Sequence, residues 1–237
     1  MLQEVYRHEL KYLISEREAA LIRRRLGECA HIDSHAAGGS YLIRSLYFDD
    51  IWESAYTTKQ AGTLTREKYR IRIYNYSDDY IKLERKAKQG SYILKTSARI
   101  DREELRMILD GDTAFLEKRE EEVLRSFYLA SVSGGLRPSV VVDYDRTPFV
   151  YGPGTVRVTF DEHVRSGFMS FDLFDSSIPV FETLETGKLI MEVKYTEYLP
   201  DNVKDLIEPG AAVQLAASKF VLCSDRMRDI RGLERIV

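Results

Sequence analysis

Apolar and polar residues alternate with a period of two in several segments that are rich in Tyr, Ile and Val. Because successive side chains of a β-strand point to opposite faces, this alternation predicts half-buried strands. Eight strands are predicted, over approximately residues 5–13, 41–49, 66–76, 79–86, 91–100, 138–147, 155–163 and 189–197.

Helical segments lie between these strands. Two capping boxes, opened by Ser15 and Asp101, predict helices over about 15–27 and 101–111. Further helices are predicted over about 113–131, 201–207 and 216–230. Strands that are joined by short turns or by helices predict an α+β fold with one antiparallel sheet. Eight strands are also about the number that closes a small β-barrel.

The polar positions of most predicted strands are charged and carry both signs. On six of the strands, the residues that share one face are, strand by strand, Arg66, Lys68, Arg70 and Arg72; Lys82, Glu84 and Lys86; Arg7, Glu9 and Lys11; Tyr144 and Arg146; Arg157 and Asp161; and Glu192 and Lys194. A solvated sheet face crossed by salt bridges would explain any one of these strands. It explains the whole set less well, because Lys, Arg and Glu dominate where surface strands usually mix in Thr, Ser and Gln. An inverted barrel, with charged faces lining a lumen and helices outside, fits the set better.

A charged lumen of this kind requires a ligand. Burying many cations without a compensating anion is very costly, and arginine forks suit phosphate oxygens. The glutamates between the cations would then bind Mg²⁺ or Mn²⁺, which bridge phosphates. The pattern therefore favours a tunnel for a phosphate chain.

Composition narrows the class of protein. The 237 residues are 44% hydrophobic and 31% charged, which is typical of a globular chain, and one domain over 1–237 is expected. With 35 basic and 38 acidic residues the net charge is −3, which argues against a generic nucleic-acid binder. Two cysteines form neither a disulfide framework nor a thiolate zinc site. No apolar stretch approaches the roughly 20 residues of a membrane span, and no apolar signal core is visible, so a cytoplasmic location is expected.

Several familiar catalytic motifs are missing from the sequence. Gly187-Lys188 is not a Walker loop, because Glu182 and Leu189 stand where glycine and Ser or Thr are required. Neither G-x-G-x-x-G nor H-E-x-x-H occurs, and the four histidines are dispersed. These absences argue against nucleophilic catalysis and leave charge neutralisation as the expected chemistry.

Seven short motifs occur in an order that resembles a known family. They are Arg7-His8-Glu9-Leu10-Lys11-Tyr12, Ser45-Leu46-Tyr47-Phe48-Asp49-Asp50, Tyr69-Arg70-Ile71-Arg72, Leu83-Glu84-Arg85-Lys86, Asp143-Tyr144-Asp145-Arg146, Met191-Glu192-Val193-Lys194 and Ser218-Lys219-Phe220. Together they resemble the VTC domain, the polyphosphate polymerase domain of the vacuolar transporter chaperone type. That domain belongs to the triphosphate tunnel metalloenzymes, which include the CYTH proteins. The resemblance extends over about residues 5–225.

The resemblance implies an eight-stranded tunnel that makes polyphosphate from ATP with Mn²⁺ or Mg²⁺. The basic positions that match its phosphate-binding residues are Lys11, Arg70, Arg72, Lys86, Arg146 and Lys219. Further substrate contacts are expected from Lys95, Tyr144, Ser218, Arg157 and Lys194. Glu192 matches the metal-coordinating glutamate, with Glu9 and Glu84 as further candidates. Glu9, Glu84 and Asp161 could equally be salt-bridge partners.

One departure from the CYTH signature E-x-E-x-K separates the possible activities. Its first glutamate is Arg7 here, which favours a longer anionic substrate and the polymerase branch. A tripolyphosphatase or nucleoside triphosphatase on the same scaffold remains an alternative, as does a non-catalytic module that binds polyphosphate or inositol phosphates. The expected partners are ATP and inorganic polyphosphate or pyrophosphate, without nucleic acid; a membrane or operon partner is left open.

Overall fold

The computed structural model describes residues 8–36, 38–90, 92–196, 198–208, 213–214 and 218–234. Contacts group the chain into two compact units. Unit 1 comprises residues 1–42, 144–164 and 184–217, and unit 2 comprises residues 43–143, 165–183 and 218–237. Each unit is built from segments that are distant in sequence, and the expectation of one domain over 1–237 stays a prediction.

The sheet of unit 1 is antiparallel and follows the strand order β11-β1-β10-β8-β7. These strands are β1 (His8–Ser15), β7 (Arg137–Tyr151), β8 (Val156–Gly167), β10 (Lys188–Tyr195) and β11 (Val213–Gln214), and β2 (His31–Ile32) pairs with β7. In this register Lys11 lies opposite Glu192, and Glu192 lies opposite Thr159. The charged positions of neighbouring strands therefore fall on the same face.

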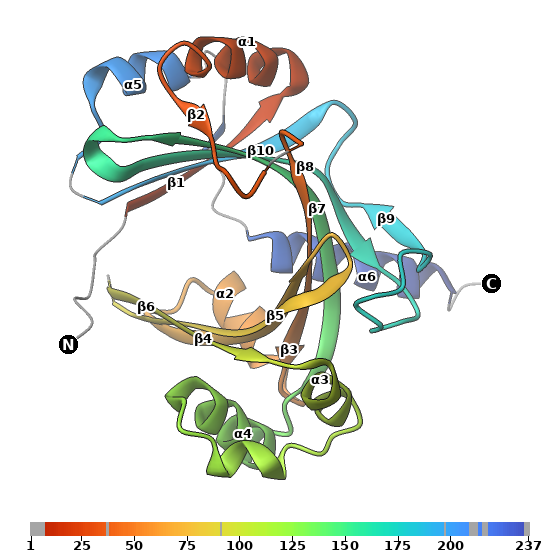
Figure 1. Cartoon of the computed structure of the whole chain (residues 1–237). Helices are drawn as coiled ribbons and strands as arrows, with labels where there is room; N and C mark the ends of the chain where they lie inside the picture. The colour runs from red at the N-terminus through yellow and green to blue at the C-terminus, as the bar shows by residue number, and fades with distance from the viewer. Residues whose placement is uncertain are drawn as a thin grey trace. The chain divides into compact units, whose positions relative to one another are not determined.

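Two helices cover the apolar face of this sheet. Helix α1 (Glu16–Leu26) and helix α5 (Asp201–Ile207) pack on alternate residues of the strands, as Figure 1 shows for α1 and α5 beside β1 and β10. The buried cluster includes Ile22, Phe160 and Met191. Ser15 and Glu18 form the predicted capping box of α1, with the Ser15 Oγ accepting from the Glu18 amide.

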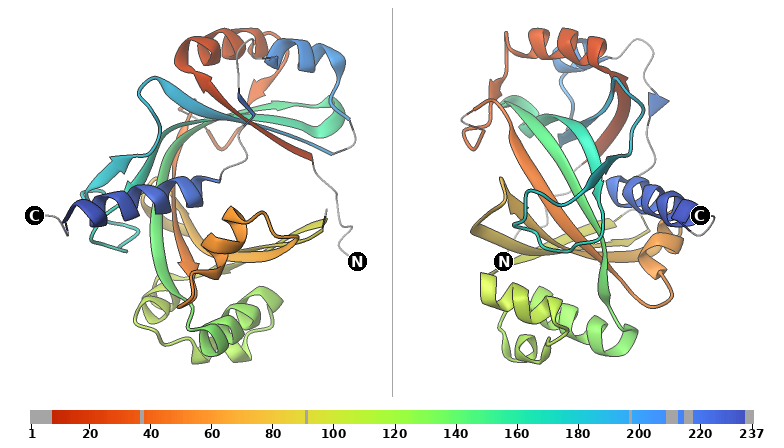
Figure 2. Two further views of the ribbon diagram at one scale, coloured as in Figure 1. Left: turned by 180° about the vertical axis from the view of Figure 1, so that it is seen from behind. Right: turned by 90° about the vertical axis from the view of Figure 1, so that its right-hand side faces the viewer.

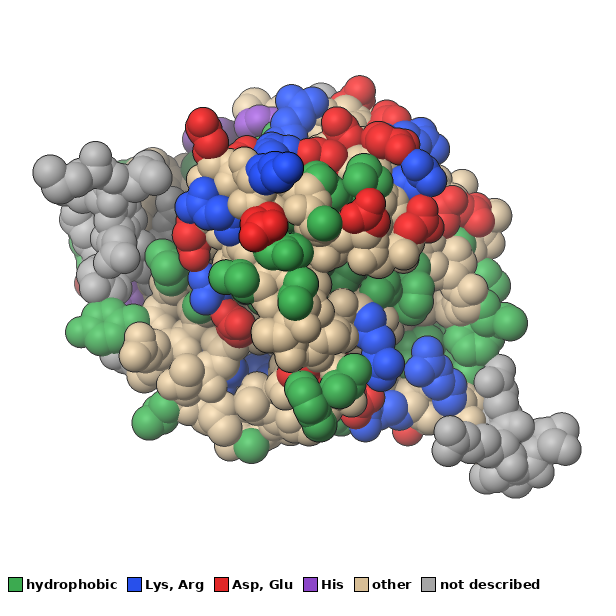
Figure 3. Space-filling model, turned by 90° about the horizontal axis from the view of Figure 1, so that it is seen from below, with side chains coloured by type: hydrophobic (Ala, Val, Ile, Leu, Met, Phe, Trp, Pro, Cys, Tyr) green, Lys and Arg blue, Asp and Glu red, His purple; other side chains and the backbone are tan. Residues whose placement is uncertain are grey.

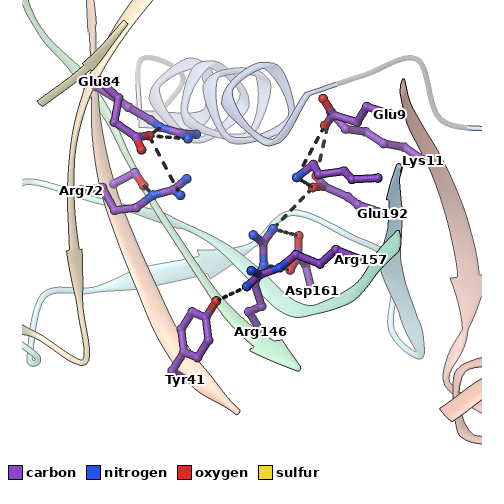
Figure 4. A network of polar contacts seen from close by, with 12 residues as sticks. Glu9, Lys11, Tyr41, Arg72, Glu84, Arg146, Arg157, Asp161 and Glu192 are labelled. Carbon is purple, nitrogen blue, oxygen red and sulfur yellow. Dashed lines mark hydrogen bonds and ion pairs between the residues drawn. The ribbon is translucent and has the colours of Figure 1, made fainter. Parts of the chain in front are cut away.

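The sheet of unit 2 follows the order β7-β3-β4-β5-β6 and is built on the same principle. Its strands are β3 (Tyr41–Asp49), β4 (Thr65–Tyr74), β5 (Ser77–Gln89) and β6 (Tyr92–Ile100), and β9 (Val180–Glu182) pairs with β8. Helix α3 (Arg102–Leu109), the 3₁₀ helix η1 (Ala114–Lys118) and helix α4 (Glu122–Gly134) cover the apolar face. Figure 3 shows acidic and basic side chains interspersed with hydrophobic ones on the outward side of this helical layer.

Two more helices lie on the other, charged face of the β4–β6 sheet. Helix α2 (Ser54–Gln60) and helix α6 (Lys219–Glu234) are adjacent there, and Figure 2 shows α2 on the side of these strands that faces away from α4. In unit 1 a short 3₁₀ helix, η2 (Pro153–Thr155), connects β7 to β8.

The expected fold class is confirmed: the chain is α+β with an antiparallel sheet and helices on its apolar faces. Within the described ranges the sheet has 11 strands, and the eight longer ones correspond to the eight predicted. The additional strands β2, β9 and β11 have only two or three residues, too few to show an alternation. The strand orders end at β11 and β6, so hydrogen bonds between the described strands do not close the sheet into a ring.

Two helix predictions differ from the structure. The helix expected over 113–131 is interrupted, because Arg119 and Glu121 adopt extended backbone angles and pair with each other between η1 and α4. The helix ends at Gly134, three residues beyond the predicted end, and its C-cap is Gly135, whose φ of 62° suits glycine. Helix α2 was not predicted at all, because its first amides are capped by residues that precede it by several positions. The start of the helix expected at 216 lies outside the described residues, as do Arg7 and the first residues of the strand expected at 5–13.

A fully buried ion pair joins β3 to β7 within unit 2. The Arg44 Nε and Nη2 donate to the two carboxylate oxygens of Asp143 at 2.8 and 2.7 Å, and neither side chain has more than 1% exposed surface. The Arg44 Nη1 donates to the Asp175 carbonyl, and the guanidinium lies 4.4 Å from the Tyr76 ring centre. These contacts satisfy the guanidinium on every side, so the pair connects two strands and the loop after β8.

We expect Asp143→Ala to destabilise the protein by about 3–5 kcal/mol, because it leaves the Arg44 charge buried without its counter-ion. The midpoint of urea unfolding measures this loss. As a control, Asp110→Ala removes one of two carboxylates that pair with the exposed Arg106 and should leave the midpoint nearly unchanged. Equal midpoints for the two variants would contradict a structural role of the buried pair.

Candidate functional site

The predicted site residues separate into two groups, one in each unit. Unit 1 holds Glu9, Lys11, Tyr144, Arg146, Arg157, Glu192 and Lys194. Unit 2 holds Arg70, Arg72, Glu84, Lys86, Lys95, Ser218 and Lys219. Every one of these residues lies within the described part of the chain.

The charged face of β4, β5 and β6 is strongly cationic. The register aligns Lys68, Lys86 and Lys95 directly across the three strands, with Arg70 and Glu84 in the next row and Arg72, Lys82 and Arg99 in the row after it. Like charges that lie directly opposite each other destabilise a sheet. Glu84 is the one carboxylate among the charged side chains of these rows, which lie wholly within the described residues. This face therefore has far more positive than negative charge.

Glu84 is the centre of this cationic face. Its Oε2 accepts from the Arg70 Nε at 2.6 Å and lies 4.0 Å from the Arg72 Nη1, while its Oε1 lies 2.9 Å from the Lys95 Nζ. Burial alone would raise the pKa of Glu84, but Arg70, Arg72 and Lys95 together hold this pKa far below its ordinary value. Glu84 is thus an anion at neutral pH, and these contacts favour a salt-bridge role over metal binding.

Lys95 is a cation of this face whose pKa departs clearly from its ordinary value. Desolvation and the neighbouring Arg70 and Arg72 lower its pKa to about 8, although Glu84 acts in the opposite direction. Its side chain still has 48% exposed surface, so an incoming anion can reach it. An ammonium with this pKa is partly deprotonated at mildly alkaline pH and gains charge when an anion binds.

Tyr47 and Phe220 support the cations from beneath. Their rings lie 5.0 Å apart, and the Lys68 Nζ lies 5.5 Å and 5.6 Å from the two ring centres. The Tyr47 hydroxyl accepts from the Arg70 Nη1 at 2.7 Å. A recess at this point is lined by Tyr47, Lys68, Arg70, Glu84, Lys86 and Lys95. Lys219, adjacent to Phe220, has only 9% exposed surface.

The charged face of unit 1 is a balanced network instead. The Arg146 Nε and Nη2 donate to the two Asp161 oxygens, both at 2.7 Å, and Nη2 also lies 3.5 Å from the Glu192 Oε2. Arg157 is held by Asp33 at 2.8 Å and donates to the Tyr41 hydroxyl at 3.3 Å. Acids and bases alternate throughout, so this face lacks the cationic excess of unit 2.

Two lysines bridge the two glutamates of this face. The Lys194 Nζ lies 2.8 Å from Glu192 and 4.0 Å from Glu9, and the Lys11 Nζ lies 3.1 Å from Glu9 and 3.9 Å from Glu192. Both carboxylates are therefore within reach of a single cation. The Arg146 guanidinium carbon lies over the Tyr144 ring, 5.2 Å from the ring centre, so Tyr144 makes a cation–π contact with Arg146.

The two glutamates fit a divalent metal ion. Carboxylate oxygens are the protein ligands that Mg²⁺ and Mn²⁺ prefer, and Mg²⁺ is commonly held by one or two carboxylates with water and substrate phosphates. Directly opposite Glu192, the Thr159 Oγ1 is buried and has no hydrogen-bond partner in the described structure. An orphaned oxygen beside Glu192 is consistent with a further ligand there. Within the described ranges, no group of three or more His, Cys, Asp or Glu side chains is placed to hold a metal ion. A metal ion bound by Glu9 and Glu192 would therefore need further ligands, such as water or phosphate oxygens.

Sequence reasoning missed several members of the site. Lys68 was recognised on the charged face but not chosen, and its place opposite Lys86 and Lys95 could have identified it. Tyr47 and Phe220 lie within the quoted motifs, but an aromatic residue in a strand or helix gives no signal of such support. Asp33 lies in the loop between β2 and β3, outside every predicted element, and could not have been assigned to Arg157 without the fold.

The chain combines an antiparallel α+β fold with two neighbouring carboxylates in unit 1 and a recess lined by cations in unit 2, which are groups suited to binding a metal ion and phosphate oxygens. Over residues 6–228 the chain matches the model of the VTC domain, so it belongs to the VTC domain family. No curated protein sequence matches the chain. Among the described residues, no helix has the length and apolar character needed to cross a membrane.

Solved structures that are similar to the chain have low sequence identity to it. A putative adenylyl cyclase from Hippeastrum, described as having a dominant triphosphatase activity, is 16% identical with a TM-score of 0.53, covering 92% of this chain and 95% of that one. The PH1819 protein of Pyrococcus horikoshii OT3 is 16% identical with a TM-score of 0.49, covering 93% of this chain and 99% of that one. The Hippeastrum likeness shows the fold alone.

The pH dependence of stability should expose the role of Glu84. Because its pKa is lowered in the folded protein, its contribution is complete at neutral pH and is lost as the pH falls from about 5 downward. We expect Glu84→Gln to lower the urea midpoint at neutral pH and to weaken its dependence on acid. The exposed Glu117→Gln should match the wild type, and an identical acid profile for Glu84→Gln would contradict the assignment.

The pH dependence of anion binding should show whether the Lys95 ammonium contributes to that binding. Because Lys95 loses its charge as the pH rises through about 8, tripolyphosphate affinity should fall severalfold between about pH 7 and 9. Lys95→Arg, which stays charged, should show a smaller fall. Calorimetric titration at both pH values measures the difference, and equal slopes for the two proteins would exclude Lys95 from the binding face.

Proposed function

We propose that the protein is a metal-dependent polyphosphate polymerase that uses ATP. A terminal oxygen of inorganic polyphosphate or pyrophosphate attacks the γ-phosphorus of ATP. The bond from that phosphorus to the β,γ-bridging oxygen breaks, and ADP leaves. The chain grows by one phosphate, and no covalent enzyme intermediate is required.

The cationic face of β4–β6 is the observation that carries this proposal. From Arg66 to Arg72 it extends over seven residues of β4, which is about 20 Å of strand. Aligned rows of lysine and arginine are unfavourable by themselves and become favourable when a polyanion lies along them. A small anion would need only part of this face, so its length supports a phosphate chain as the ligand.

Within unit 2, Arg70, Arg72, Lys86, Lys95 and Lys219 would bind phosphate oxygens. The contacts of Arg70 with Glu84 and Tyr47 fix its guanidinium before the ligand arrives, so little reorganisation is needed when negative charge develops. Ser218, next to Lys219 and 8% exposed, is a candidate for a further contact.

Within unit 1, Glu192 and Glu9 would hold Mn²⁺ or Mg²⁺, which supplies charge neutralisation at the phosphates. Lys11 and Lys194, which contact these glutamates, are free to turn to phosphate oxygens once another cation neutralises the carboxylates. Arg146 is held in place by Asp161 and would bind a phosphate with its remaining face, beside Arg157. A cytoplasmic location remains part of the proposal.

A hydrolase is the second candidate, because the Hippeastrum protein of the same fold is described as a triphosphatase. The groups that bind a triphosphate would be the same, with water as the acceptor. A module that binds polyphosphate or inositol phosphates without turnover would keep the cationic face and have no need of the two glutamates.

The deciding experiment supplies purified protein with ATP and Mn²⁺, with and without pyrophosphate, and resolves the products on a gel stained for polyphosphate. A metal-dependent ladder with matching ADP release identifies the polymerase. Orthophosphate without a ladder identifies the hydrolase. Tight binding of polyphosphate without turnover leaves a binding module.

Variants in both units should abolish the same reaction. Arg72→Ala, Lys86→Ala and Glu192→Gln should each lower turnover by about a hundredfold or more, because each removes a charge that acts on the phosphates. The exposed Lys118→Ala serves as a matched control and should keep wild-type turnover. Near-normal turnover in Lys86→Ala, with the fold intact, would remove the β4–β6 face from the site.

A further inference from the structure

Helix α6 begins on the cationic face. Lys219 is its first residue and Phe220 its second, and Phe220 is fully buried against Tyr47. The Lys68 ammonium lies over both rings. The position of this helix along its axis therefore sets where the Lys219 ammonium and the Lys68 support lie.

The far side of α6 is held by helix α2, through two polar contacts and one ring contact. The Tyr56 hydroxyl donates to the Asp225 carboxylate at 2.5 Å, and the Arg228 Nη2 lies 2.5 Å from the Glu53 carboxylate. The Arg228 guanidinium also lies 3.9 Å from the Tyr56 ring centre. We call these four residues the α2–α6 latch.

Helix α2 is in turn fixed to the strand that carries Tyr47. The Asp49 carboxylate accepts from the backbone amides of Ala55 and Tyr56 at 2.8 and 3.1 Å, and the Asp50 carboxylate accepts from Trp52 and Ser54. Asp49 follows Tyr47 by two residues, so both belong to the same face of β3. The contacts form a closed circuit from Tyr47 through Asp49, Tyr56 and Asp225 to Phe220 and back.

We propose that the α2–α6 latch is a positioning device for Lys219. Tyr56, Asp225, Glu53 and Arg228 touch no substrate; they hold α6 in the position at which Phe220 packs on Tyr47 and Lys219 enters the phosphate-binding face. This inference rests on the proposed role of Lys219 in binding phosphate. It gives the Asp49-Asp50 pair of the sequence motif a function, which is to anchor the helix that carries half of the latch.

Helix α6 has a second set of contacts, which join it to β8. The Ser166 hydroxyl donates to the Cys223 carbonyl at 3.2 Å, and the Cys223 thiol lies 3.5 Å from the Arg165 carbonyl. These contacts join α6 to β8 on its buried side. If they alone set the position of α6, removing the latch would leave Lys219 unaffected.

The test removes one hydroxyl. Tyr56→Phe deletes the bond to Asp225 and keeps the ring, and we expect it to weaken binding of inorganic tripolyphosphate by about threefold to tenfold. In a Lys219→Ala background the same change should have no further effect, because the latch acts through Lys219. Calorimetric titration of the wild type, both single variants and the double variant provides the four dissociation constants.

Matched variants separate the latch from general changes. Tyr198→Phe makes the same deletion at an exposed tyrosine of unit 1, and Asp229→Asn changes an exposed acid of α6; both should bind as the wild type does. Asp225→Asn keeps an oxygen that accepts from Tyr56 and should bind more tightly than Asp225→Ala.

Hydrogen exchange distinguishes failure of the latch from failure of the proposed function. Tyr56→Phe should speed exchange at the amides of α6 and leave β4 and β5 unchanged, whether or not any ligand is present. Unchanged exchange in α6, or equal effects of Tyr56→Phe with and without Lys219, overturns the latch. A wild-type protein that neither binds tripolyphosphate nor makes polyphosphate overturns the proposed function, while the exchange measurement still decides whether the latch holds α6.

Discussion

The cost of gathering cations on one sheet face is the constraint on which the rest of the structure depends. Rows of lysine and arginine lie side by side on β4, β5 and β6, and Glu84 is the carboxylate at their centre. Aromatic rings, serine and tyrosine hydroxyls and the start of α6 all serve to keep these charges apart and oriented. The opposite face of the same strands is largely apolar and supplies buried area against which helices α3 and α4 pack, although Glu67 and Arg85 pair with each other there.

The strands of both units have one apolar and one charged face, but the charged faces differ in their balance of positive and negative side chains. In unit 1, each cation of the charged face has a carboxylate close by, and Asp161, Glu192 and Glu9 carry that balance. In unit 2 the balance is tipped toward positive charge. A balanced network can accept a metal ion without building up net charge, whereas a cationic face requires an anion. The difference fits the proposed roles, in which the carboxylates of unit 1 bind the metal ion and the cationic face of unit 2 supplies most of the positive charge for the phosphate chain.

The seven short motifs of the sequence contain both candidate site residues and residues that support them. Asp143 looks equivalent to Tyr144 and Arg146 in its motif, yet it is sealed in an ion pair with Arg44. Asp49 and Asp50 cap a helix, and Phe220 packs under a lysine beside Lys219. Each motif therefore contains two kinds of residue: side chains that face the candidate site, and side chains that hold them in place. The sequence of the motif does not distinguish the two kinds, whereas the direction of each side chain in the structure does.

The sequence by itself determined the strands, the capped helices and the charged face of each strand, because alternation and capping depend on residues that are close in the chain. Both capping boxes and the eight longer strands follow from such local patterns. The ion pairs between these charged side chains could be identified only from the tertiary structure. Glu84 is surrounded by Arg70 and Lys95, Asp161 takes Arg146, and Asp33 takes Arg157, across separations that no local pattern encodes. Helix α2 belongs to the same category, since its amides are satisfied by the end of a strand and its side chains by α6. Register and long-range packing set these contacts, and they arise only when strands that are distant in sequence pair.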